Sequence, residues 1–216
     1  MGTVGEGRPA GVYDCGMARE CIHYESAVAH VLRTRGIPYL ATNEARKTLP
    51  VVNEGTEGDA ARALKSFDFV VTLPGGCGRE PLRLLVDVKG RRCRLNSSSA
   101  EVRLENWVTR EDVEGLAAWE KVFGSPFRAA FAFVYGMDEQ PPDVMFREVF
   151  EYRGRWYGMR WVLLADYVAR MKQRSPRWGT VHVPGWAGQV PECTLAMLNE
   201  SGAGGAAGGS MASVRS

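Results

Sequence analysis

Two apolar segments on either side of a glycine-rich turn constrain the fold of this chain more than any other feature. Residues 67–73 (FDFVVTL) and 82–89 (LRLLVDVK) are rich in valine, leucine and phenylalanine, and PGGCG lies between them. Segments of this length around a Pro/Gly turn predict an antiparallel β-hairpin. If the strands pair about the middle of the turn, Asp68 lies directly opposite Asp87, so the hairpin predicts two facing carboxylates.

Helical and strand patterns alternate on both sides of this hairpin. Helices are predicted at about residues 23–35 and 109–123, and a glycine ends each one. Residues 127–135 (FRAAFAFVY) are apolar on both faces, which is typical of a central strand. The other predicted elements are a strand at residues 38–45, a hairpin at 145–163 that turns at 153–155, a helix at 164–172 and a strand at 180–183. This order predicts an α/β fold.

The chain of 216 residues is of a length that suits one domain. Residues 1–17 are rich in glycine and are predicted to be a flexible arm, and residues 201–216 (SGAGGAAGGSMASVRS) are predicted to be disordered. Residues 18–200 are predicted to form the domain. Within it, residues 46–65 are polar and irregular, with a helical turn expected near residues 59–64.

The composition excludes several classes of protein. The longest apolar run, residues 129–135, is far shorter than the roughly 20 residues that cross a bilayer, and the N-terminus lacks a hydrophobic signal core. The five cysteines form no CxxC pair, which argues against a zinc ribbon and a disulfide framework. We therefore expect a cytoplasmic protein without membrane association. The net charge of +2 does not by itself indicate a nucleic-acid binder, so a basic surface must come from local clustering.

The facing carboxylates predict a metal site. Lys89 lies two residues after Asp87 and shares its face of the strand. Two carboxylates about 5 Å apart repel by roughly 3 kcal/mol at an effective dielectric near 20. A divalent cation such as Mg²⁺ would offset this repulsion, because it binds one or two carboxylates and keeps sites for water and phosphate. Lys89 would steady a phosphate oxygen or an attacking water.

Glu25 is the candidate for a further ligand. On a helical projection it lies in the middle of the apolar stripe, between Val28 and Ala29, where a carboxylate needs a metal or a partner. The alternatives are an arginine partner or a favourable position near the positive helix end. His23 is expected to point away and to have no special role.

Arginines follow the proposed site directly. Gly90 is followed by Arg91, Arg92 and, after Cys93, Arg94, which are expected to grip phosphates at the mouth of the site. The alternative is a solvated basic loop. Arg153, Arg155 and Trp156 form a second basic-aromatic cluster, whereas Trp107, Trp119 and Trp161 are expected in the core.

An acidic helix, a strand, a hairpin with Asp and Asp-x-Lys, a helix and a strand follow one another in residues 22–135. This order resembles the PD-(D/E)xK nuclease superfamily and implies a restriction-endonuclease-like mixed central sheet flanked by helices. By resemblance, Glu25, Asp68 and Asp87 would hold Mg²⁺ or Mn²⁺, and Lys89 would position water for phosphodiester hydrolysis. The sequence departs from the pattern because no proline precedes Asp68, residues 46–65 form an insertion, and Glu44 is a rival for the role of Glu25.

The expected function is that of a metal-dependent endonuclease acting on nucleic acid, with DNA favoured; the resemblance leaves a homodimer open. One alternative is a non-catalytic module of the same fold that binds nucleic acid or a protein partner. Another is an unrelated α/β protein in which arginines neutralise the aspartates. The tripeptide alone decides nothing, because about 0.6 acid-x-Lys tripeptides are expected by chance in this composition.

Overall fold

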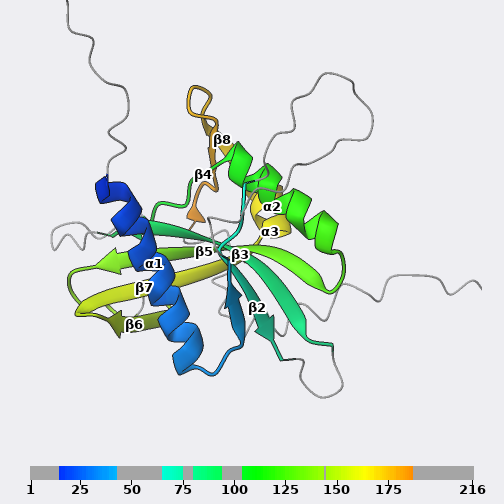
Figure 1. The fold of residues 1–216 in the computed structure, drawn as a ribbon. Coiled ribbons are helices and arrows are strands. Elements are labelled where there is room, and N and C mark those ends of the chain that lie inside the picture. The colour runs from blue at the N-terminus through cyan, green and yellow to red at the C-terminus, as the bar shows by residue number, and fades with distance from the viewer. Residues whose placement is uncertain (1–14, 43–64, 75–79, 94–103, 144, 187–216) are drawn as a thin grey trace, which may run out of the picture.

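The computed structural model describes residues 15–42, 65–74, 80–93, 104–143 and 145–186 of the chain (Figure 1). The predicted α/β fold class is confirmed: a mixed central sheet is flanked by helices. The elements are helices α1 (Cys15–Thr34), α2 (Arg110–Phe123) and α3 (Leu164–Arg170), and strands β1 (Tyr39–Ala41), β2 (Phe69–Leu73), β3 (Leu82–Arg92), β4 (Val108–Thr109), β5 (Phe127–Met137), β6 (Glu148–Tyr152), β7 (Arg155–Leu163), β8 (Lys172–Ser175) and β9 (Thr180–His182).

The main sheet has the strand order β1-β2-β3-β5-β7-β6. Strands β3 and β5 are parallel, and all other neighbours in this sheet are antiparallel. A parallel pair needs a crossover connection, and the segment containing α2 supplies it. The long apolar strand predicted at residues 127–135 is indeed central, because β5 lies between β3 and β7.

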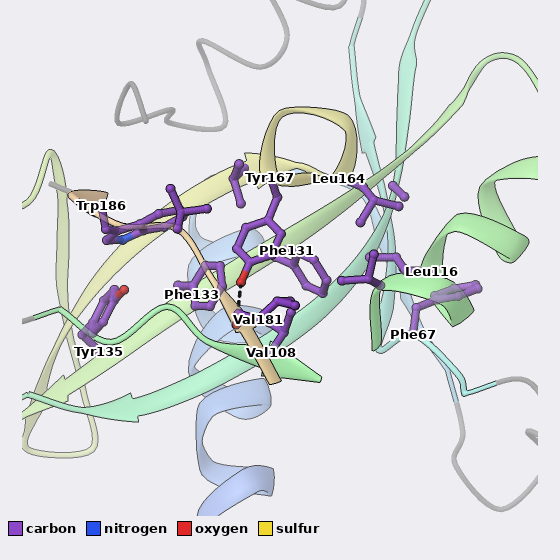
Figure 2. Close-up of a cluster of buried hydrophobic side chains, with 14 of the residues drawn as sticks. Phe67, Val108, Leu116, Phe131, Phe133, Tyr135, Leu164, Tyr167, Val181 and Trp186 are labelled. Carbon is purple, nitrogen blue, oxygen red and sulfur yellow. Dashed lines mark hydrogen bonds between the residues drawn. The ribbon is translucent and has the colours of Figure 1, made fainter. Parts of the chain in front are cut away.

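Apolar side chains on the two faces of this sheet form two separate cores. Val86 and Ala132 pack with Val28 and Leu32 of α1 on one face. The other core joins residues of β3 and β5 to α2, α3 and the small sheet (Figure 2); its members include Leu85, Phe131, Phe133, Leu116, Tyr167 and Val181. Side chains alternate along a strand, so Asp87 and Lys89 of β3 lie on the same face as Leu85, toward α2.

A second sheet, with the order β4-β9-β8, stands beside the start of α2 (Figure 1). Buried hydrogen bonds extend the pairing of β4 with β9, because the Asn106 side chain donates to the Val183 carbonyl and accepts from its amide, both at 2.9 Å. The Tyr167 hydroxyl donates to the Asn106 carbonyl at 2.8 Å. This attachment gives the β8–β9 hairpin a fixed base.

Most predicted elements are present, with differences at the ends. The first helix begins at Cys15 rather than near residue 23, and the first strand is only Tyr39–Ala41. Strands β4 and β8 were not predicted, because β4 has two residues and β8 (KQRS) is polar and lacks an apolar alternation. The helical turn expected near residues 59–64 lies outside the described residues. Within the described ranges, none of the helices combines the length and hydropathy that a bilayer crossing requires.

Candidate active site

The hairpin pairs in the predicted register. Phe69 of β2 faces Val86 of β3, and Asp68, one residue before this pair, lies close enough to Asp87 for its charge to raise the Asp87 pKa. The Asp68 amide donates to the Val86 carbonyl at 2.7 Å. One carboxylate oxygen of Asp68, Oδ2, accepts the amide hydrogen of Val88 at 2.7 Å. Asp68 therefore ends the β2–β3 ladder with its own side chain and is held beside Asp87.

Asp87 is buried in the middle of the sheet, with 7% of its surface exposed. Its Oδ2 lies 2.8 Å from Lys89 Nζ. Burial raises the pKa of Asp87 to about 7; Lys89 opposes this shift, whereas the carboxylates of Asp68 and Asp112 add to it. A carboxylic acid with this pKa exchanges its proton near neutral pH, which is a useful property for acid–base chemistry or for binding a cation.

Asp112 completes the charged cluster from the first turn of α2. Its backbone amide donates to the Thr109 hydroxyl, and its own Oδ2 accepts the Thr109 amide at 2.8 Å, which is a capping box. Its other oxygen, Oδ1, lies 3.0 Å from Lys89 Nζ and also contacts Lys65 Nζ. Burial would raise the pKa of Asp112, but Lys89, Lys65 and the Thr109 amide outweigh burial and lower it to about 2.

Lys89 thus joins two carboxylates from different elements. Burial alone would lower the pKa of its ammonium group, but Asp87 and Asp112 raise it above its ordinary value. Lys89 therefore stays protonated and can donate to a ligand but cannot act as a base at neutral pH. The alternative in which arginines neutralise the aspartates does not hold for Asp87, whose cationic partner is Lys89.

Asp112 was not predicted from the sequence as a residue of the site. The contact of Asp112 with Lys89 follows from the connection between two parallel strands. Helix α2 leads from β3 to β5, so the N-terminal end of α2 lies near the carboxyl end of β3, where Lys89 is located. Polar residues at such a position are frequent in ligand sites of α/β proteins. The sequence alone did not establish the parallel pairing.

Glu25 comes from the helix on the other face of the sheet. The stripe of α1 that packs on the sheet contains Ala27, Val28, Val31 and Leu32, all buried, whereas Glu25 is only partly buried. Glu25 therefore lies at the flank of the stripe and not in its middle. Its role in the site stays a prediction. Its rival Glu44 lies outside the described residues.

His23 faces the sheet, contrary to expectation. One of its ring nitrogens lies 2.7 Å from the hydroxyl of Tyr157, whose side chain is fully buried. Next to it, Tyr24 lies directly on Gly90, where a Cβ atom would stand 2.1 Å from the tyrosine ring. The start of the packed part of α1 is thus fixed against β3, immediately after Lys89.

The arginines after Lys89 are not on a loop, because β3 continues through Arg92. Arg91 turns inward: its guanidinium lies 4.2 Å from the centre of the Trp107 ring and donates to the carbonyls of Gly90 and Trp107. The alternative of a solvated loop is therefore wrong for Arg91, and its contact with phosphate stays a prediction. Arg92 is exposed and lies 3.1 Å from Asp138, and Arg94 lies outside the described residues.

Among the described residues, no group of three or more His, Cys, Asp and Glu side chains is arranged to hold a metal ion. The structure places Asp87 and Asp112 around Lys89, with Lys65 at the edge and Asp68 close enough to Asp87 to raise its pKa. Two carboxylates are sufficient for Mg²⁺ when water and phosphate supply the remaining ligands. The donor set thus fits a cation that shares its coordination with a substrate.

No known family of protein sequences matches the chain, and no curated protein sequence does either. One similar solved structure is Archaeoglobus fulgidus Hjc, described as a Holliday junction resolvase from an archaeal hyperthermophile. The two chains are 14% identical, and the TM-score is 0.39. The similarity covers 77% of this chain and 89% of the other.

Proposed function

We propose that this chain is a metal-dependent nuclease that hydrolyses phosphodiester bonds in nucleic acid, with DNA as its substrate. The observation that carries the proposal is the nearness of the Asp68 and Asp87 carboxylates, with the Lys89 ammonium 2.8 Å from the Asp87 carboxylate. Three separate parts of the chain, the residue before β2, strand β3 and helix α2, contribute charged groups to this one place. Asp87 and Asp112 are both buried, which is unusual for aspartates that form only a surface ion pair.

The raised pKa of Asp87 supports a cation at this place. Burial and the neighbouring carboxylates Asp68 and Asp112 oppose the ionised form of Asp87 more strongly than Lys89 favours it. Asp68 and Asp87 would hold Mg²⁺ or Mn²⁺, with Glu25 or Glu44 as further candidate ligands. Such an ion, when bound, polarises a phosphoryl oxygen and lowers the pKa of bound water.

The chain's own residues have distinct tasks in this proposal. Lys89, held protonated, donates a hydrogen bond to a phosphate oxygen or orients the attacking water. Asp112 positions Lys89 through its 3.0 Å contact and is itself fixed by the capping box of α2. Asp68 is fixed by the Val88 amide. Preorganised donors and acceptors of this kind need little rearrangement when substrate binds.

Cleavage of a supercoiled plasmid in the presence of Mn²⁺ tests the proposal. The wild-type chain should nick the plasmid, Asp87→Ala should not, and Asp138→Ala, an exposed aspartate at the end of β5, should behave like the wild type. Chelation of the metal should stop the reaction. Equal cleavage by the wild type and Asp87→Ala would assign the activity to a contaminant, and inactivity of all three proteins would refute the proposal.

A non-catalytic binding module is the second candidate. The observation that favours it is that Lys89 and Lys65 already balance Asp87 and Asp112 within the protein. In that case DNA binding should persist in Asp87→Ala, and neither protein should cut. Measuring binding and cleavage on the same preparations separates the two candidates.

A further inference from the structure

The turn between β8 and β9 carries a tryptophan that the fold does not bury. Trp178 is 70% exposed, whereas the other five tryptophans, Trp107, Trp119, Trp156, Trp161 and Trp186, are buried or partly buried. An indole ring is a large apolar surface, and its exposure at a hairpin turn gives nothing to the core. A binding role would explain why a tryptophan stands there.

This turn is held in place at several points. The Gly179 amide donates to the Pro176 carbonyl at 3.3 Å, and Gly179 has a φ of 56°, which suits glycine. The amide of Arg110, the first residue of α2, donates to the Gly179 carbonyl at 2.8 Å. Trp178 is therefore presented on a fixed backbone and not on a free loop.

The surroundings of Trp178 are basic. Residues 167–191 contain no aspartate or glutamate, although 25 acidic residues in 216 would give about three in a stretch of this length by composition alone. Lys172, Arg174 and Arg177 lie in the same hairpin and are exposed. The Arg177 guanidinium lies 5.2 Å from the centre of the Trp178 ring, and Arg174 lies 3.5 Å from Glu105. We call Lys172, Arg174, Arg177 and Trp178 the basic-aromatic tip.

The basic-aromatic tip adjoins the candidate active site. Strand β9 pairs with β4, with Thr180 facing Thr109, the residue that caps α2. Asp112, which contacts Lys89, lies in the first turn of the same helix. Figure 1 shows the β8–β9 hairpin projecting from the molecule beside the start of α2. A strand of nucleic acid held at Asp87 could thus continue along the hairpin.

We propose that the basic-aromatic tip binds DNA that contains unpaired bases, with Trp178 stacked on a base and Lys172, Arg174 and Arg177 against the backbone phosphates. This inference rests on the proposed function and narrows its substrate to single-stranded or locally unpaired DNA next to the cleaved bond. An indole stacks on the face of a base, and that face is accessible only where the base is unpaired. A stacking aromatic among cations is the usual combination in proteins that bind single strands.

Fluorescence anisotropy tests the inference. The probes are a fluorescein-labelled single strand of about 30 nucleotides and the corresponding duplex, both in EDTA so that binding is measured without cleavage. Trp178→Ala should weaken single-strand binding about tenfold or more, because one stacked base contributes an effect of that size. Trp178→Phe should recover most of the affinity, and duplex binding should change much less.

Leu40→Ala is the matched control, since Leu40 is equally exposed, at 71%, and lies on β1, an edge strand of the main sheet. It should bind the single strand like the wild type. Equal single-strand affinity of Trp178→Ala and the wild type would overturn the inference, as would equal losses on single strand and duplex. Binding of neither DNA by the wild type would overturn it as well, and would point to another kind of partner.

The result for the basic-aromatic tip can be distinguished from the result for the proposed nuclease activity. If the wild type cuts DNA in an Asp87-dependent manner but Trp178→Ala binds normally, only the inference about the tip fails. If single-strand binding depends on Trp178 but no preparation cuts, the nuclease proposal fails and the tip is still a binding surface. The same labelled sequence as RNA tests whether the backbone contacts prefer DNA.

Discussion

The ammonium nitrogen of Lys89 lies 3.0 Å from Oδ1 of Asp112 and 2.8 Å from Oδ2 of Asp87, so a single cation links the helix α2 to the strand β3. The two carboxylates differ strongly, because the pKa of Asp87 is raised to about 7 and that of Asp112 is lowered to about 2. At neutral pH Asp112 is the constant partner of Lys89, and Asp87 is the one that changes its charge.

We expect Asp112→Asn to lower kcat for DNA cleavage about tenfold and to leave KM nearly unchanged. The substitution keeps an oxygen that can accept the Thr109 amide but removes the charge that positions Lys89. Glu114→Gln, an exposed change on the same helix, serves as the control. A fall in thermal stability with an unchanged kcat would show that Asp112 is only a helix cap.

We expect Asp87→Asn to stabilise the fold at pH 8. The pKa of Asp87 rises from its ordinary 3.8 to about 7 on folding, so the folded state binds the extra proton and this group's contribution to stability falls as pH rises from about 4 to about 7. Asparagine removes this penalty, and Lys89 keeps Asp112 as its partner. The free energy of unfolding should rise by about 1–3 kcal/mol at pH 8.

Thermal melts of the wild type and Asp87→Asn at several pH values measure this effect. The stabilisation should shrink as the pH is lowered toward 5, where Asp87 is already protonated in the folded protein. Below about pH 4 both proteins should lose stability together, because Asp112, with a pKa of about 2, loses its folded-state advantage as it is protonated. A difference between the two proteins that did not vary with pH would contradict the shifted pKa of Asp87.

We expect Mg²⁺ or Mn²⁺ to raise the melting temperature of the wild type but not that of Asp68→Asn. A ligand at about 100 times its Kd stabilises the folded state by about 2.7 kcal/mol. Asp138→Asn controls for loss of surface charge, since Asp138 is exposed and distant from β2 in the sheet. An identical metal-induced shift in all three proteins would rule out Asp68 as a ligand.

We expect Gly90→Ala to destabilise the fold by about 1–3 kcal/mol, as overpacked substitutions do. A Cβ atom at this position would stand 2.1 Å from the Tyr24 ring, so α1 or β3 has to shift. Urea unfolding measures the loss. The double variant Gly90→Ala with Tyr24→Ala should be less destabilised than the two single changes together imply, and strict additivity would mean that the two residues do not interact.

The sequence predicted the part of the site that depends on local pairing. A short turn sets the register of a hairpin, so the pairing of Phe69 with Val86 and the nearness of Asp68 to Asp87 followed from the distance of each residue from the PGGCG segment. The second helix and the central strand were also predicted, because their apolar patterns and capping residues are local signals.

Contacts that depend on the packing of distant elements were not predicted. Asp112 meets Lys89 only because β5 pairs in parallel with β3 and brings the crossover helix with it. Arg91 lies on Trp107, a residue that was expected in the core. Trp178 received no role, since its exposure depends on how the β8–β9 hairpin is attached to α2.

The Asp68 side chain accepts the Val88 amide hydrogen at the end of the pairing between β2 and β3. Beyond this point β3 continues through Arg92, and among the described residues β5 is its one neighbouring strand there. A strand with one open side is a template on which a strand of another molecule can add, and charged residues at such edges oppose aggregation. Asp68 stands where such an addition would start. A related protein without catalytic activity would still be more soluble with an aspartate at this position. The presence of Asp68 in a related chain is therefore not by itself a sign of activity.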